Sequence, residues 1–310
     1  MRTPDDLRAI YAFLMTRTPV IAPASETSLP FPFNIRLLMT GWNLLFHQAG
    51  EYRSDSSMDE EWNRGAYLVE GLGHCGACHS PRNIFGAASK TGSSAYGGGQ
   101  AEGWYVPPLN ENSPNPIPWT LNSLVNYLID GWDGHHGIAA GPMTPIVNDL
   151  YEQSEDDVYA IAAYVRSLKG DPLTAEEQET MTAEARAAAN QLEWGHPENP
   201  PIPDDPVLQL GARVFETQCA TCHKTGGQPV PLALTTVVNA PDPANLIKIT
   251  FGGILPPPRG VLERQMPARS IEISDEEMVA LAAFVRDRFT DRPPWQRLEA
   301  AVRAARPDGG

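Results

Sequence analysis

Basic residues and long apolar runs are both scarce in this 310-residue sequence. It holds 23 Lys and Arg against 38 Asp and Glu, for a formal net charge of −15. Because nucleic-acid binding depends on clusters of Lys and Arg, this composition excludes DNA or RNA as a partner. No stretch approaches the roughly 18 consecutive apolar residues that a membrane-spanning helix needs, and the first residues do not form the apolar core of a secretory signal. With 26 Gly and 30 Pro, the chain is predicted to be globular, rich in loops and long enough for about two domains.

Cysteine is also scarce, and its placement is the most informative feature of the sequence. All four cysteines lie in two copies of one pattern, which are Cys75-Gly-Ala-Cys78-His79 and Cys219-Ala-Thr-Cys222-His223. On one helical turn both thiols of such a pattern project to the same side, where each can form a thioether with a vinyl group of haem. The adjacent histidine then supplies the proximal iron ligand. The sequence therefore predicts two covalently bound haem c groups, with His79 and His223 as iron ligands.

Three other uses of paired cysteines compete with this interpretation. A four-thiolate zinc site would not require a histidine directly after each pair, and the two pairs are far apart in the sequence. A thioredoxin-like redox motif would explain one pair but not its duplication, and no βαβ pattern surrounds it. Disulfides within each pair would constrain very little of the chain. The repeated histidine favours haem.

A haem with one histidine ligand is an electron carrier if a second protein ligand closes its far side, and a reactive site if that side stays open. Each motif is followed by a methionine in a Gly- or Pro-rich stretch, Met143 in Gly-Pro-Met and Met266 in Met-Pro, and each methionine shortly precedes an amphipathic helix. We therefore predict Met143 and Met266 as the second iron ligands. His135 and His136 are the alternatives for the first haem.

One helix pattern occurs three times, beginning at Thr3, Ser154 and Ser274. Each copy has a Ser or Thr N-cap, carboxylates in the first turn and apolar residues at helical spacing. The second and third copies close a unit that starts with Cys-x-x-Cys-His, whereas no such unit precedes the first. We therefore hypothesise that this sequence is the downstream part of a three-haem protein with an export signal. The alternative is a coincidental amphipathic helix at the start.

Several segments together resemble a known family. They are residues 31–36, 62–69, 71–83, 103–104 and 141–143, and the resemblance extends over nearly the whole chain. These segments are similar to the cytochrome c subunits of membrane-bound bacterial alcohol and gluconate dehydrogenase complexes, which carry three haems with His and Met ligands. The resemblance implies that one haem is held by Cys75, Cys78, His79 and Met143 and the other by Cys219, Cys222, His223 and Met266.

The same resemblance implies an electron-transfer subunit without catalysis of its own. It would relay electrons from the catalytic subunit of a periplasmic dehydrogenase, oxidising an alcohol, a sugar acid or an aldehyde, to quinone or a terminal oxidase. Such a subunit would lie in the periplasm at the outer face of the inner membrane, held by partners or by a segment outside this sequence. Residues 135–143 resemble a branch that serves molybdenum hydroxylases. A di-haem peroxidase-type enzyme is the remaining alternative.

The expected fold is mainly α, with two tandem class I cytochrome c-like domains joined by Pro-rich linkers. We expect a helix and linker over residues 1–50, the first domain over 51–173, a linker over 174–206, the second domain over 207–290 and a tail over 291–310. Helices are predicted near residues 34–48, 60–71, 120–130, 154–168 and 174–192. The Gly-, Ser- and Pro-rich residues 89–118 are expected to form a loop over the haem.

Overall fold

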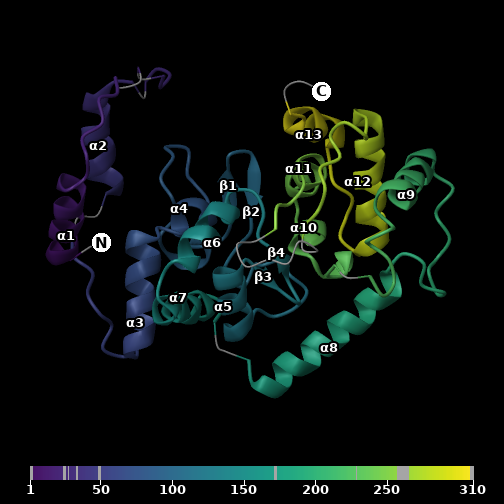
Figure 1. Ribbon diagram of the computed structural model, residues 1–310, viewed down its shortest axis with the longest axis horizontal. Helices are drawn as coiled ribbons and strands as arrows, with labels where there is room; N and C mark the ends of the chain where they lie inside the picture. Colours follow the sequence, from purple (N-terminus) through teal and green to yellow (C-terminus); the bar gives the residue numbers. More distant parts are fainter. Residues whose placement is uncertain are drawn as a thin grey trace.

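The computed structural model describes residues 3–23, 26, 28–32, 34–47, 50–170, 173–227, 229–256 and 265–307. Over these ranges the chain is mainly α, as predicted, and two short antiparallel hairpins are the only sheet (Figure 1). The α-helices are α1 (Pro4–Met15), α2 (Arg36–Phe46), α3 (Glu60–Tyr67), α4 (Gly76–His79), α5 (Leu121–Asp130), α6 (Met143–Tyr151), α7 (Glu155–Ser167), α8 (Ala175–Leu192), α9 (Pro206–Gln218), α10 (Thr236–Asn239), α11 (Ala244–Gly252), α12 (Asp275–Phe289) and α13 (Leu298–Ala305). None of these described helices is both long and apolar enough to cross a lipid bilayer.

The first hairpin lies within residues 89–118, which the sequence had predicted to be loop. Strand β1 (Gly99–Ala101) pairs with β2 (Trp104–Val106), and the two residues between them, Glu102 and Gly103, both have positive φ. Two such residues are what a tight two-residue hairpin turn requires. The second hairpin, β3 (Trp132–Asp133) with β4 (Gly137–Ile138), follows α5.

The three predicted copies of one helix are confirmed as α1, α7 and α12. In each, the side chain of the capping residue Thr3, Ser154 or Ser274 accepts a hydrogen bond from the backbone N–H three residues later. Their surroundings differ, because α7 and α12 bury apolar faces whereas α1 has no buried residue. The α1 helix instead meets the rest of the chain through polar contacts, in which the Tyr67 hydroxyl donates to Asp6.

We call residues 60–167, from α3 to α7, the first unit. Its core is a cluster of buried residues from α3, α5, α7 and the loop that contains Tyr96. Helix α3 crosses α7 at Gly65, where an added β-carbon would lie 1.9 Å from the carbonyl oxygen of Ala160. Only glycine allows the two backbones to approach this closely.

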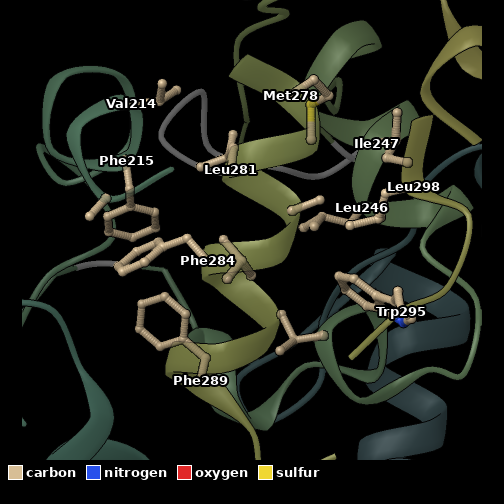
Figure 2. Close-up of a cluster of buried hydrophobic side chains, with 14 of the residues drawn as sticks. Val214, Phe215, Leu246, Ile247, Met278, Leu281, Phe284, Phe289, Trp295 and Leu298 are labelled. Atoms are coloured by element: carbon tan, nitrogen blue, oxygen red, sulfur yellow. The ribbon is translucent and has the colours of Figure 1, made fainter. Parts of the chain in front are cut away.

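We call residues 206–305, from α9 to α13, the second unit. Its core contains an aromatic cluster in which Phe215 of α9 packs on Phe284 and Phe289 of α12. Figure 2 shows these rings on one side of α12, with Leu246 and Leu298, the first residue of α13, on the other side. The helix crossing repeats that of the first unit, because a β-carbon added at Gly211 of α9 would lie 2.1 Å from the Ala280 carbonyl oxygen of α12.

The second core also recruits residues from outside the predicted 207–290 domain. Ile117, from the loop before α5, and Ala189, from α8, are each 2% exposed in this cluster, and Trp295 and Leu298 of the predicted tail belong to it as well. Helix α8 spans from the end of the first unit to the second (Figure 1). On the way, Arg186 of α8 contacts the first unit at Gly134 and His135. The two units are therefore connected by side chains of α8 and of the loop before α5 that pack on or contact the neighbouring unit.

Candidate haem sites

The first Cys-x-x-Cys-His copy folds into one helical turn, α4. It follows α3 through a π-helical segment, Leu68–Leu72. The backbone N–H groups of Cys78 and His79 donate to the Cys75 carbonyl at 3.2 and 3.0 Å, which places both cysteines on one turn as predicted. Cys75 is half-buried and Cys78 is exposed. The ring of Tyr96 packs on the motif, since a β-carbon added at Gly76 would meet its ring atoms at 3.6 Å.

The ring of His79 is oriented by a backbone carbonyl. His79 is buried, and its Nδ1 lies 2.8 Å from the carbonyl oxygen of Pro107. Because a carbonyl can only accept, Nδ1 carries the proton and Nε2 keeps its lone pair. A histidine that binds a metal through one nitrogen commonly donates from the other to such an oxygen. Burial lowers the pKa of His79, which also favours the neutral, iron-binding form.

The two rival histidines of the first site are engaged elsewhere. His136 is buried, with Nδ1 2.7 Å from Asp133 Oδ1 and Nε2 3.4 Å from the Ile117 carbonyl oxygen. Its ring also stacks on Trp119, with 3.6 Å between ring centroids. Both nitrogens of His136 therefore face oxygen acceptors inside the first unit.

His135, in contrast, faces a hydrogen-bond donor. Its Nδ1 lies 2.9 Å from Nη1 of Arg186, and a guanidinium can only donate. The lone pair of His135 is therefore used at Nδ1 and the proton sits on Nε2. In this arrangement the lone pair of His135 is engaged by Arg186, and the ring of His136 is buried against Asp133, Ile117 and Trp119, which favours Met143 as the second ligand of the first site.

Met143 is the half-buried first residue of α6. Two residues before it, Gly141 has a φ of +56°, and a β-carbon there would lie 2.6 Å from the indole ring of Trp104. The Gly-Pro-Met loop is thus pressed against Trp104 of β2. The role of Trp104 was not predicted, because nothing in the local pattern connects it to a loop that follows it at this distance in the chain.

The second motif continues directly from α9. His223 N–H donates to the Cys219 carbonyl at 2.9 Å, so the turn resembles that of the first site. Burial lowers the pKa of His223, as it does for the first histidine. Within the described residues, however, the His223 ring has no hydrogen-bond partner. Cys222 is exposed and Cys219 half-buried.

Met266 is supported by backbone pairing. It forms an isolated antiparallel bridge with Ile254, in which each N–H donates to the other's carbonyl at 2.8 and 3.0 Å. Ile254 comes shortly after the end of α11, and residues 257–264 between the two bridge partners lie outside the described ranges. The backbone near the two predicted methionine ligands is therefore held differently: Gly141, two residues before Met143, lies against an indole ring, whereas Met266 itself forms a strand-like bridge.

The competing cysteine chemistries do not agree with these observations. All four cysteines are free, so the disulfide interpretation is wrong. A four-thiolate zinc site would need both cysteine pairs in one cluster, and no group of three or more His, Cys, Asp and Glu residues that could hold a metal is found in the described part of the chain. Burial raises the pKa of Cys75 and of Cys219 to about 11, opposite to the lowered pKa of a thioredoxin-type thiol. Free thiols on one turn, an oriented imidazole and a thioether form a donor set that fits haem c.

Comparisons with known proteins find similarity to cytochrome c proteins and to subunits of bacterial dehydrogenases. Residues 206–285 match the family model described as cytochrome c oxidase, cbb3-type, subunit III. The chain is 40% identical to a nicotinate dehydrogenase subunit of Pseudomonas putida, over 98% of this chain and 24% of that protein. It is 31% identical to the cytochrome c subunit of the alcohol dehydrogenase (quinone) of Gluconobacter oxydans, over 94% of this chain and 61% of that subunit.

A similar match is found with the gluconate 2-dehydrogenase cytochrome c subunit of Pantoea cypripedii, at 32% identity over 91% of this chain and 65% of that subunit. The chain thus spans less than two thirds of each of these relatives. The resemblance inferred from the sequence is confirmed by these matches.

Proposed function

Because this chain is a homologue of the cytochrome c subunits of bacterial dehydrogenases, we propose that it is an electron-transfer subunit that carries two haem c groups. The observation that carries the proposal is the hydrogen bond from His79 Nδ1 to the Pro107 carbonyl, at the end of a turn that presents both cysteines of the motif. It prepares one imidazole nitrogen for iron. The second copy of the motif has the same backbone turn.

In the proposed sites the cysteines would hold the haems covalently, and His79 and His223 would each supply an iron ligand. Met143 and Met266 would supply the second ligand of each iron. When bound, haem c supplies one-electron redox chemistry, and the protein contributes the ligands, the burial and the orientation. With one histidine and one methionine of this chain available for each iron, the sites would suit electron relay. A di-haem peroxidase would need a vacant distal position.

The proposed donor is the catalytic subunit of a periplasmic dehydrogenase that oxidises an alcohol, a sugar acid or an aldehyde, and the proposed acceptor is quinone or a terminal oxidase. A second candidate donor is a molybdenum hydroxylase. The match to a nicotinate dehydrogenase subunit favours it, because that relative is more similar to this chain than the alcohol and gluconate dehydrogenase subunits are. For either donor we propose a periplasmic location at the outer face of the inner membrane.

The proposal is tested by producing the chain in a bacterial periplasm that attaches haem c. We expect two covalent haems for each chain by the pyridine haemochrome assay and a weak far-red charge-transfer band in the ferric spectrum, which reports methionine ligation. Replacing Met143 and Met266 by Ala, one at a time, should each remove one part of that band. Absence of covalent haem, or a high-spin spectrum in the unmodified chain, would contradict the proposal.

The donor is then identified by reduction assays. The ferric chain is mixed with a quinone-dependent alcohol dehydrogenase plus ethanol, or with a nicotinate-oxidising hydroxylase plus nicotinate. The donor that reduces both haems within a single turnover is the partner class. No reduction by either would reject both proposed donors.

A further inference from the structure

The first and second units meet where the edge of β2 lies along α11 (Figure 1). Asn245 of α11 makes two hydrogen bonds with the backbone of one residue of β2. Its Oδ1 accepts from the Tyr105 N–H at 2.9 Å, and its Nδ2 donates to the Tyr105 carbonyl at 2.8 Å. The amide side chain thus completes the strand edge as a neighbouring strand would.

One turn further along α11, Lys248 reaches the same hairpin. Its Nζ donates to the Glu102 carbonyl at 3.1 Å and lies 5.4 Å from the ring centroid of Trp104, within the range of a cation–π contact. A β-carbon at Gly103 would approach the Lys248 ammonium to 3.2 Å, so the glycine leaves room for this contact. Two residues of α11 therefore hold the turn and the second strand of the hairpin.

The indole that Lys248 contacts is the one that supports the methionine loop. Gly141 lies against Trp104 so closely that a β-carbon would be 2.6 Å from the ring. The loop then turns into α6 through weak local hydrogen bonds, with Met143 N–H donating to the Ala140 carbonyl at 3.3 Å. Trp104 therefore lies between a helix of the second unit and the loop that presents Met143.

We propose that Trp104 is a positioning residue for Met143, and that α11 keeps Trp104 in place through Lys248 and Asn245. Methionine ligation of the first haem then depends on a helix of the second unit. This inference rests on the proposed function, since it concerns the distal ligand of a haem. Positioned ligands need such supporting side chains, because a small displacement of a ligand weakens its bond to the metal.

The same helix is connected to the other predicted ligand. Directly beyond α11, Gly253 has a φ of +71° and packs against the Met266 backbone, where a β-carbon would lie 2.5 Å from the Met266 carbonyl oxygen. The next residue, Ile254, forms the bridge with Met266. Helix α11 therefore contacts Trp104, which lies against the Met143 loop, and it leads directly into Ile254, which pairs with Met266. In this proposal a substitution at Lys248 affects the first site through Trp104.

The experiment compares variants of the haem-loaded chain by two measurements that do not depend on electron-transfer activity. The first is the far-red charge-transfer band of the ferric protein, with Met143→Ala defining the part that belongs to the first haem. The second is hydrogen exchange of the backbone amides in residues 139–151. We expect Trp104→Ala to remove most of the first-haem part of the band and to speed exchange there by about tenfold. Trp104→Phe, which keeps an aromatic ring, should preserve most of both.

Lys248→Met tests the contribution of the second unit while keeping the length of the side chain. We expect it to weaken the first-haem part of the band, with a smaller increase in exchange than Trp104→Ala causes, and we expect Lys248→Arg to restore the signal because the cation is retained. Lys90→Met, at an exposed lysine of the first unit, is the matched control and should change neither measurement.

The outcomes separate the inference from the function that it rests on. If the unmodified chain lacks covalent haem or the far-red band, the proposed function fails. If the band is present and survives Trp104→Ala with unchanged exchange, the positioning role is wrong. If Trp104→Ala removes the band but Lys248→Met and Asn245→Ala leave it intact, the dependence on α11 is wrong. Should Trp104→Ala not fold, the folded Lys248→Met variant still decides between these results.

Discussion

The two units share a helix crossing but differ in what surrounds it. In both, a glycine of the helix before the Cys-x-x-Cys-His motif lies against an alanine carbonyl of the repeated helix, and an aromatic residue follows one turn later. That residue is Tyr164 in the first unit, where its hydroxyl donates to Glu70 at 2.7 Å, and Phe284 in the second unit, where it packs within an aromatic cluster.

The two motif histidines also differ in the polar groups around them. His79 is oriented by the Pro107 carbonyl, whereas His223 has no ring partner among the described residues. The comparison shows that the repeated residues specify the helix crossing and the motif turn. The polarity around each site comes from residues that the two copies do not share, such as Tyr164 in place of Phe284 and the Pro107 carbonyl beside His79.

The shared crossing can be tested at its two glycines, where we expect the largest effects. Gly65→Ala and Gly211→Ala should each destabilise the chain by about 3 kcal/mol, because the new β-carbon would lie about 2 Å from a backbone oxygen and must push the helices apart. Urea unfolding of the haem-loaded variants measures this.

The matched control is Gly41→Ala in α2, where a β-carbon would have no neighbour within 4 Å. We expect it to stabilise the chain slightly, by up to about 1 kcal/mol, through helix propensity alone. If only one of the two crossing variants is destabilised, the two helix crossings are not equivalent.

A buried arginine distinguishes the second unit from the first. Arg286 of α12 donates through Nη1 to the Val238 and Ala240 carbonyls at 2.5 and 3.0 Å and through Nε to the Pro293 carbonyl at 2.9 Å. Arg286→Met would remove the guanidinium donor from the Val238 and Pro293 carbonyls, whereas the Ala240 carbonyl keeps its hydrogen bond from Trp295 Nε1, and we expect a loss of about 2 kcal/mol. At the corresponding place in α7, Arg166→Met should cost less than about 0.5 kcal/mol.

Unfolding of the two arginine variants by urea, followed by circular dichroism, checks the difference between them. Equal losses for both would show that the buried guanidinium does not distinguish the units.

The smallest expected effect concerns a residue at which the units differ in charge. Lys169 lies as far beyond the capping Ser154 as Phe289, which is 1% exposed, lies beyond Ser274. Burial lowers the pKa of Lys169 to about 8. Between that value and the usual lysine pKa the unfolded chain binds more protons than the folded chain, so this residue makes stability rise with pH over that range. Below it the penalty of burying the charge is fully present.

Lys169→Met removes that penalty. We expect a gain of about 1 kcal/mol at pH 7 that disappears as the pH approaches 10. Urea unfolding across this pH range measures it, and Lys90→Met, at an exposed lysine, should show no such trend. A gain that is independent of pH would mean that the charge of Lys169 has no energetic role.

Local patterns predicted the parts of the fold that depend on neighbours in the sequence. The repeated helices were found because caps at Thr3, Ser154 and Ser274 and the apolar spacing act within one helix. The hairpin of β1 and β2 was missed, because its strands are only three residues long and lie in a Gly-rich stretch. The burial of Ile117 in the second core was missed because it is decided by contacts between distant segments.

By itself, the sequence determined the mainly α class, the two motif turns and the residues proposed to hold two haems, because a Cys-x-x-Cys-His turn and a capped helix need only nearby residues. Only the tertiary structure decided which carbonyl orients His79, which side chains engage His135 and His136, and how α11 reaches Trp104 beside the Met143 loop. These features depend on contacts between backbone and side chains far apart in the chain, and such contacts leave no periodic signal in the sequence.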